Sequence, residues 1–165
     1  PVLLIDEIDR ADEEFEAFLL EVLSEFQVSI PELGTIKALN QPFVILTSNR
    51  SRELSDALRR RCMYLWIDYP DLEKELRIVR AKIPEIESTL ATQICQFVMN
   101  AREIQLEKNP GISETLDWAR SLVVLNLKCL DVQVVEKTMG AFIKDADDLE
   151  RMRQGSIEFL LEKIF

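Results

Sequence analysis

Residues 1–9 read P-V-L-L-I-D-E-I-D, an apolar run that leads into two acids with no turn residue between them. A short apolar run with β-branched residues is typical of a fully buried strand. Ligands of open α/β sheets bind outside the carboxyl ends of the strands, so we expect Asp6 and Glu7 to face a ligand. Because adjacent side chains of a strand diverge, the two acids should have different roles. In nucleotide hydrolysis one would hold Mg²⁺ through water and the other would orient the attacking water. The alternative is a buried strand that simply ends in solvated acids.

The composition limits the possible folds and functions. The chain has 165 residues, 47% hydrophobic and 30% charged, which is typical of one globular domain or two small ones. Its net charge of −10 disfavours broad contact with a phosphate backbone, so we expect no nucleic-acid partner. No apolar run is long enough to cross a bilayer and no signal peptide is visible. We therefore expect a cytoplasmic protein without a membrane partner.

Histidine is absent, and the cysteines Cys62, Cys95 and Cys129 are widely spaced. A thiolate metal site and a disulfide framework are therefore both poorly supported. The absence of histidine also excludes Ser–His and Cys–His nucleophilic catalysis.

A second apolar run, Phe43 to Leu46, leads into a polar cluster at residues 47–49. If the two strands are adjacent and parallel, their carboxyl ends lie at the same edge of the sheet. Asn49 would then lie near Glu7 and could hold the same water molecule. The alternative is that Asn49 only begins a turn, which is a common role for asparagine.

The segment between the two strands is predicted to form a helix followed by a hairpin. Apolar residues recur at helical spacing from Phe15 to Phe26, and Asp9 or Asp12 offers an N-cap. Two short β-prone runs then flank the turn residues 31–34, which is typical of a hairpin.

Arginines are concentrated just after the second strand, namely Arg50, Arg52, Arg59, Arg60 and Arg61. Residues 54–61 read as a short helix and residues 63–67 as a further strand. Arginines at the end of a helix often only balance its dipole. They can also reach the nucleotide of a neighbouring subunit, where a guanidinium stabilises the charge on the transferring phosphoryl group.

Several of these motifs together resemble the MoxR family of AAA+ ATPases. The matching stretches are V-L-L-I-D-E-I-D-R-A (2–11), V-S-I-P-E-L-G-T-I (28–36), I-L-T-S-N-R (45–50), D-A-L-R-R-R-C (56–62) and I-D-Y-P (67–70). The resemblance implies that Asp6 and Glu7 form the Walker B pair, with Asp6 placing the metal. It implies that Asn49 is the sensor 1 residue. Arg61 matches the arginine finger best, and Arg60 is its close competitor.

Residues 71–165 show helical spacing without strand alternation, and by resemblance they form the helical lid of the AAA+ fold. Helices are expected at residues 72–82, 87–106, 113–127, 131–144 and 146–163. Ser113 is predicted to cap the third of these helices, and Trp118 to lie in the core. Relatives commonly carry a sensor 2 arginine near the start of that helix. Arg120 lies about a turn and a half further on, so it either reaches the nucleotide or is a solvated lid residue.

The phosphate-binding pattern G-x-x-x-x-G-K-S/T does not occur in these residues. In the family that loop precedes the Walker B motif, so we expect it before Pro1 and expect the isolated chain to be inactive. The expected fold is α/β. A partial parallel AAA+ core sheet with flanking helices and a hairpin insertion occupies residues 1–70, and the all-helical lid occupies residues 71–165.

The MoxR resemblance implies an ATPase that uses ATP and Mg²⁺ for chaperone-like remodelling or maturation of partner proteins. It implies a ring of identical subunits, expected to be a hexamer. By family analogy, it also implies a von Willebrand factor A domain protein and a client protein as partners. Two alternatives stay open: a non-catalytic scaffold that retains the AAA+ fold, and a DNA-associated motor of the clamp-loader kind.

Overall fold

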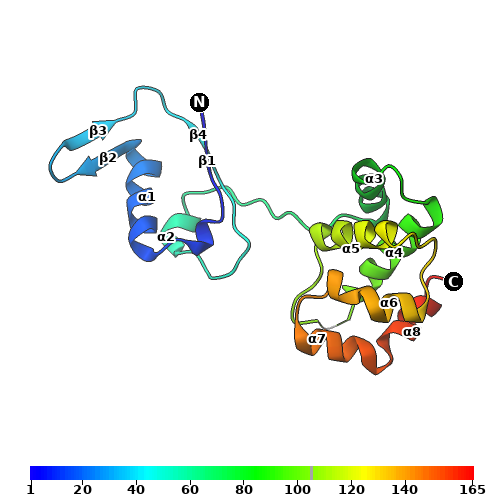
Figure 1. Cartoon of the computed structure of the whole chain (residues 1–165). Coiled ribbons are helices and arrows are strands. Elements are labelled where there is room, and N and C mark those ends of the chain that lie inside the picture. The colour runs from blue at the N-terminus through cyan, green and yellow to red at the C-terminus, as the bar shows by residue number, and fades with distance from the viewer. Residues whose placement is uncertain (105) are drawn as a thin grey trace. The chain divides into compact units, whose positions relative to one another are not determined.

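The computed structural model describes residues 1–104 and 106–165, and the chain divides into two units, Pro1–Trp66 and Ile67–Phe165 (Figure 1). The first unit holds all the strands found among the described residues, and the second is helical. This mixed α/β architecture confirms the expected fold class. The division falls four residues before the expected boundary after residue 70.

The first unit is built on two parallel strands, β1 (Val2–Ile5) and β4 (Phe43–Leu46), paired in register from Val2 with Phe43 to Ile5 with Leu46. Between them the chain forms a 3₁₀ turn (Ile8–Arg10), helix α1 (Glu13–Glu25) and an antiparallel hairpin, β2 (Gln27–Ile30) and β3 (Gly34–Lys37). Helix α2 (Asp56–Arg59) follows β4. Figure 1 shows the hairpin extending beyond the end of α1.

Local capping explains where the helices of this unit begin. The Asp12 carboxylate accepts a hydrogen bond from the backbone N–H of Phe15, so Asp12 caps α1 and the alternative cap, Asp9, does not. Ser55 caps α2 by accepting from the N–H of Leu58. The core of the unit is small, and Ile8, Leu19 and Leu58 are its fully buried apolar side chains.

Two strand predictions were wrong. The first strand is not buried, since the side chains of Val2 and Leu4 are 68% and 59% exposed. Among the described residues β1 pairs with β4 alone. Residues 63–67 are not a strand either, although they are apolar and β-prone. A strand requires a hydrogen-bonded neighbour, and no described segment pairs with these residues.

The second unit consists of α3 (Leu72–Lys82), α4 (Ser88–Ala101), α5 (Ile112–Val124), α6 (Val132–Thr138), α7 (Ala146–Arg151) and α8 (Ile157–Glu162). A 3₁₀ turn (Met139–Ala141) follows α6, and a kinked segment (Met152–Ser156), which is not helical at Gln154 and Gly155, joins α7 to α8. The bounds of α3 match the sequence prediction, with Asp71 capping its first turn.

The other helix predictions were too long or capped at the wrong residue. The helix expected at 146–163 is interrupted, because Gly155 has φ of 102°, a left-handed conformation that glycine tolerates. The helix expected at 131–144 gives way to the 3₁₀ turn. Ser113 is not the cap of α5, because Gly111 occupies that position and the Glu114 carboxylate accepts from its N–H. The helix expected at 87–106 ends at Ala101, and residue 105 lies outside the described residues.

The helical unit has its own aromatic core. Trp118 is fully buried, as predicted, and its ring centroid lies 5.5 Å from that of Phe97 and 4.3 Å from that of Phe142. The indole N–H of Trp118 donates to Thr138 Oγ1 at 2.8 Å. This bond satisfies the one polar group that the indole carries into the core. Among the described residues, no helix has the length and apolarity that spanning a bilayer requires.

Candidate functional site

The parallel ladder of β1 and β4 continues for one step beyond the strands. The N–H of Thr47 donates to the carbonyl of Ile5 at 3.0 Å, and the N–H of Ile8 donates to the carbonyl of Thr47 at 2.9 Å. The residues that follow both strands therefore leave the sheet at the same edge. Ligands of open α/β sheets bind at this edge.

Thr47 links the two acids that follow β1. Its hydroxyl donates to the Asp6 carboxylate and accepts from the backbone N–H of Glu7 at 3.0 Å. The Asp6 side chain remains exposed. Thr47 thus fixes the direction of one Asp6 oxygen while leaving the carboxylate open to solvent.

Glu7 is held from two sides. The amide of Asn49 donates to Glu7 Oε1 at 3.0 Å, and the Arg10 guanidinium lies 2.9 Å from Glu7 Oε2. The backbone of Glu7 is left-handed, with φ of 52°. This conformation is uncommon for a residue with a side chain, and its occurrence beside Asn49 marks a locally strained turn at the sheet edge.

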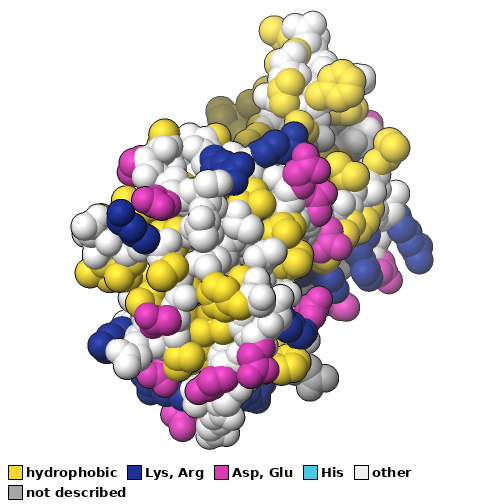
Figure 2. All heavy atoms as spheres, turned by 90° about the vertical axis from the view of Figure 1, so that its right-hand side faces the viewer, with side chains coloured by type: hydrophobic (Ala, Val, Ile, Leu, Met, Phe, Trp, Pro, Cys, Tyr) yellow, Lys and Arg dark blue, Asp and Glu magenta, His cyan; other side chains and the backbone are white. Residues whose placement is uncertain are grey.

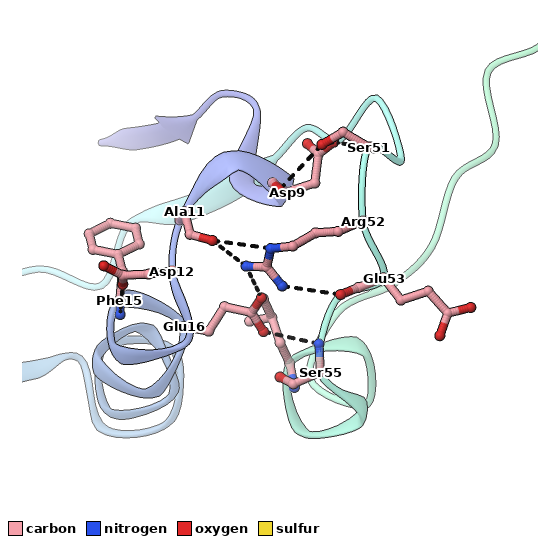
Figure 3. Close-up of polar contacts among 10 residues, drawn as sticks. Asp9, Ala11, Asp12, Phe15, Glu16, Ser51, Arg52, Glu53 and Ser55 are labelled. Atoms are coloured by element: carbon pink, nitrogen blue, oxygen red, sulfur yellow. Dashed lines mark hydrogen bonds and ion pairs between the residues drawn. The ribbon is translucent and has the colours of Figure 1, made fainter.

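Asp9, which sequence reasoning considered only as a helix cap, is the best-satisfied acid of this region. Its carboxylate accepts from the N–H of Asn49 at 3.2 Å. It also accepts from the N–H of Ser51 at 2.7 Å and from the Ser51 hydroxyl at 2.6 Å (Figure 3). The side chain is 2% exposed. The hydrogen bonds from Ser51, with that from Asn49, hold the pKa of Asp9 well below its usual range. The sequence contained one indication of this contact, the equal spacing of its two partners: Asp9 lies two residues after Glu7, and Ser51 lies two residues after Asn49.

A second network joins the loop after Asn49 to helix α1. The Arg52 guanidinium donates to the carbonyl of Ala11 and forms an ion pair with buried Glu16 at 2.5 Å (Figure 3). The second Glu16 oxygen accepts from the N–H of Ser55 at 3.0 Å. Although burial opposes ionisation of Glu16, the hydrogen bonds from Ser55 and the charge of Arg52 lower its pKa. The loop that carries Asn49 is thus attached to α1 as well as to the turn after β1.

We expect acid to destabilise the unit Pro1–Trp66 through Asp9 and Glu16. Their pKa values are lower in the folded state than in the unfolded state, so they stabilise the fold above the unfolded values near 4. This contribution is lost progressively as the pH falls from about 5 to about 2. The amide resonances of Leu19 and Ser51, followed by NMR against pH, should report the loss. A Glu16→Gln variant should show a less steep acid transition, because one proton fewer is then taken up on unfolding, and an acid transition unchanged by that variant would contradict the assignment.

The two arginines predicted as fingers, Arg60 and Arg61, directly follow α2. Arg61 donates to Ser24 Oγ at 2.8 Å and to the carbonyl of Ala57 at 3.1 Å, and Arg60 is exposed. Within the described part of the chain, no hydrogen bond or ion pair joins either arginine to the acids after β1. A residue that acts on a neighbouring subunit's nucleotide need not contact its own. Their role stays a prediction.

Arg120 belongs to the helical unit, where its guanidinium lies 3.4 Å from the Asp117 carboxylate. Its side chain is 54% exposed. This environment is that of a solvated surface residue, and a contact with a nucleotide is untested.

The donor set at the sheet edge suits a hard cation held mainly by non-protein ligands. Asp6 and Thr47 present oxygen atoms, the ligand type that Mg²⁺ prefers, and Mg²⁺ commonly takes one or two carboxylates together with water and substrate phosphates. Among the described residues, no cluster of three or more acids, cysteines or histidines could bind a metal by itself. A cation at this edge would take its remaining ligands from water or from a phosphorylated substrate.

Comparison with known proteins returns the Holliday junction branch migration complex subunit RuvB. The chain is 25% identical over 172 aligned residues to RuvB of Thermotoga petrophila and 24% identical to that of Thermotoga maritima. Each alignment covers 98% of the chain and 50% of the relative, so the chain spans about half the length of the curated relatives that it matches. No family model matches the chain.

Two solved structures of Thermotoga maritima RuvB point mutants share the fold. Both superpose with a TM-score of 0.55, at 25% and 27% sequence identity. They cover 90% of this chain, which corresponds to 47% and 46% of the solved chains. The similarity therefore extends through both units.

These relatives correct the expected partners. We excluded nucleic acid because of the charge of −10, whereas the relatives are subunits of a complex named for a DNA junction, so the exclusion was wrong. Net charge averages over the whole chain and does not report a local contact or one made by another subunit. The von Willebrand factor A domain protein and the client protein, inferred only from the MoxR resemblance, gain no support. The fold and the similarity to RuvB support membership of the AAA+ ATPase family, without the narrower MoxR assignment.

Proposed function

We propose that this chain forms the second half of the ATP-hydrolysing core and the lid of a DNA-associated AAA+ motor. The observation that carries the proposal is the hydrogen bond of 3.0 Å from Asn49 to Glu7 at the carboxyl edge of β1 and β4. It places an amide and a carboxylate, two groups suited to holding one water molecule, next to the exposed Asp6. The similarity to RuvB favours a motor over a scaffold without chemistry.

Each residue at the edge has a distinct role in this proposal. Asp6, oriented by Thr47, would hold Mg²⁺, and Glu7 would accept the proton of the attacking water or polarise it. Asn49 fixes the carboxylate of Glu7 and the position of the water. ATP would be the substrate at this edge, and Mg²⁺, when bound, would neutralise the charge that develops on the γ-phosphoryl group. Because the described chain lacks a phosphate-binding loop, we propose that a preceding segment of the gene product provides it.

A ring of subunits would give the arginines that follow α2 a role in hydrolysis. We propose that Arg61, or its neighbour Arg60, acts on the nucleotide of the adjacent subunit. Guanidinium groups that act in this way contribute about 10³- to 10⁵-fold to rate in other phosphoryl-transfer enzymes. Arg120 remains the candidate for the sensor 2 position in the lid.

The proposal that the motor associates with DNA rests on the similarity to RuvB and not on the surface charge of this chain. On the face shown in Figure 2, acidic and basic side chains are interspersed with apolar ones, and no broad basic area is visible. The net charge of −10 likewise disfavours extensive contact with phosphates. We therefore propose that this part of the motor contacts few phosphates directly, so that its affinity for DNA depends weakly on salt.

The test is ATP hydrolysis by the full gene product with and without a synthetic four-way DNA junction. We expect Mg²⁺-dependent turnover that the junction changes at least twofold, and no turnover by residues 1–165 alone. A full gene product that binds no ATP would contradict the motor and favour a scaffold. Turnover that responds to no DNA, single-stranded, duplex or four-way, would contradict DNA association.

A further inference from the structure

We infer that Asp9 is a positioning residue that holds Asn49 in place to engage Glu7, an inference that rests on the proposed function. The Asp9 carboxylate contacts the loop of Asn49 through three hydrogen bonds, from two backbone N–H groups and one hydroxyl. One of these donors is the backbone N–H of Asn49 itself. Asp9 therefore acts on the residue whose side chain contacts the proposed catalytic acid.

The loop geometry shows why such a contact is needed. Arg50, between the two residues whose N–H groups bind Asp9, has a left-handed backbone with φ of 59°. A residue with a Cβ adopts this conformation at a cost, and surrounding contacts must maintain it. The bonds from Asn49 and Ser51 to the two Asp9 oxygens lie on either side of Arg50. They fix the loop in the conformation that directs the Asn49 amide toward Glu7.

Only an ionised carboxylate at position 9 can accept both backbone hydrogen bonds from the loop. Both oxygens of an ionised carboxylate accept hydrogen bonds, whereas an amide offers one acceptor and one donor group. An asparagine at this position would direct an N–H₂ group against the N–H of either Asn49 or Ser51. Asp9→Asn therefore removes one of the two backbone hydrogen bonds that hold the loop, from Asn49 or from Ser51, while preserving the size of the side chain.

The first experiment measures amide hydrogen exchange in residues 1–165. Asp9→Asn should accelerate exchange at Asn49 and Ser51 by roughly tenfold or more, while exchange at Leu19 in α1 changes little. Asp12→Asn is the matched control, because Asp12 is exposed and asparagine also caps helices well. If Asp9→Asn unfolds the whole unit, Ser51→Ala, which removes the hydroxyl donor alone, should show the same local effect at smaller size.

The second experiment separates positioning from general stability through kinetics of the full gene product. Asp9→Asn should lower kcat for ATP hydrolysis by about 10-fold or more and leave KM for ATP within about threefold, because Asn49 acts on the attacking water. Asp12→Asn should change neither.

Unchanged hydrogen exchange at Asn49 in Asp9→Asn would overturn the positioning role of Asp9. The same conclusion would follow if Asp9→Asn and Asp12→Asn lowered kcat equally. A wild-type protein without ATP hydrolysis would instead overturn the proposed function, and the catalytic part of this inference with it. The exchange data would then still show whether Asp9 orders the loop.

Discussion

Glu7→Gln in the full gene product is expected to lower kcat for ATP hydrolysis by about 10²- to 10⁴-fold, the usual contribution of a positioned general base. Glutamine preserves the size of the side chain and can still accept the hydrogen bond from Asn49. It cannot accept a proton from water, and it loses the ion pair with Arg10. Because Glu7 is proposed to act on water and not on the nucleotide, the Kd for ATP should change by less than about threefold.

The matched control for this variant is Glu14→Gln. Glu14 is an exposed acid in the first turn of α1, so the same chemical change should leave turnover within about twofold. Nucleotide binding and single-turnover hydrolysis should be measured on both variants. A Glu7→Gln protein that retains more than a tenth of wild-type kcat would remove Glu7 from the proposed role.

Glu75→Gln is expected to destabilise the helical unit by about 3 to 5 kcal/mol, the range typical of breaking a buried ion pair. Glu75 is 1% exposed and contacts the Arg102 guanidinium through two bonds of 2.7 and 2.9 Å. The Thr115 hydroxyl donates to the same carboxylate at 2.7 Å, and Tyr69 stacks against the guanidinium at 4.7 Å. Removing the carboxylate charge would leave Arg102 buried without a counter-charge.

Urea unfolding followed by Trp118 fluorescence would measure this effect, with Trp66→Phe as the background so that one tryptophan reports. Glu87→Gln is the control, because Glu87 pairs with Lys128 at 3.7 Å with both side chains largely exposed. Pairs of that kind contribute about 1 kcal/mol at most. Replacing Glu75 and Arg102 together by methionine should recover much of the loss. Equal destabilisation by Glu75→Gln and Glu87→Gln would contradict a special role for the buried pair.

Local patterns in the sequence predicted the parts of the structure that local forces determine. The bounds of α3 followed from helical periodicity, and the structure shows that Asp71 caps its first turn. The proximity of Asn49 to Glu7 followed from two apolar runs that each end in polar residues, once the strands were taken as parallel. A strand prediction at residues 63–67 failed, because β propensity does not reveal whether a neighbouring strand is available.

The two polar networks that support the fold were not predictable in the same way. Arg102 and Glu75 are 27 positions apart, and Ser51 and Asp9 are 42 positions apart. No periodicity connects residues at such separations, so the pairs emerge only from the tertiary packing. The break in the last helix had a visible signal, Gly155, although a single glycine within helical periodicity does not require an interruption.

The role assigned to the sheet edge is tested most directly by a crystal structure of the full gene product with Mg²⁺ and a non-hydrolysable ATP analogue. The proposal predicts Mg²⁺ next to Asp6, bound directly at about 2.1 Å or through one of its waters. It also predicts a water molecule that contacts both Glu7 and Asn49 and faces the γ-phosphate. A nucleotide bound elsewhere, with solvent alone at Asp6 and Glu7, would contradict it.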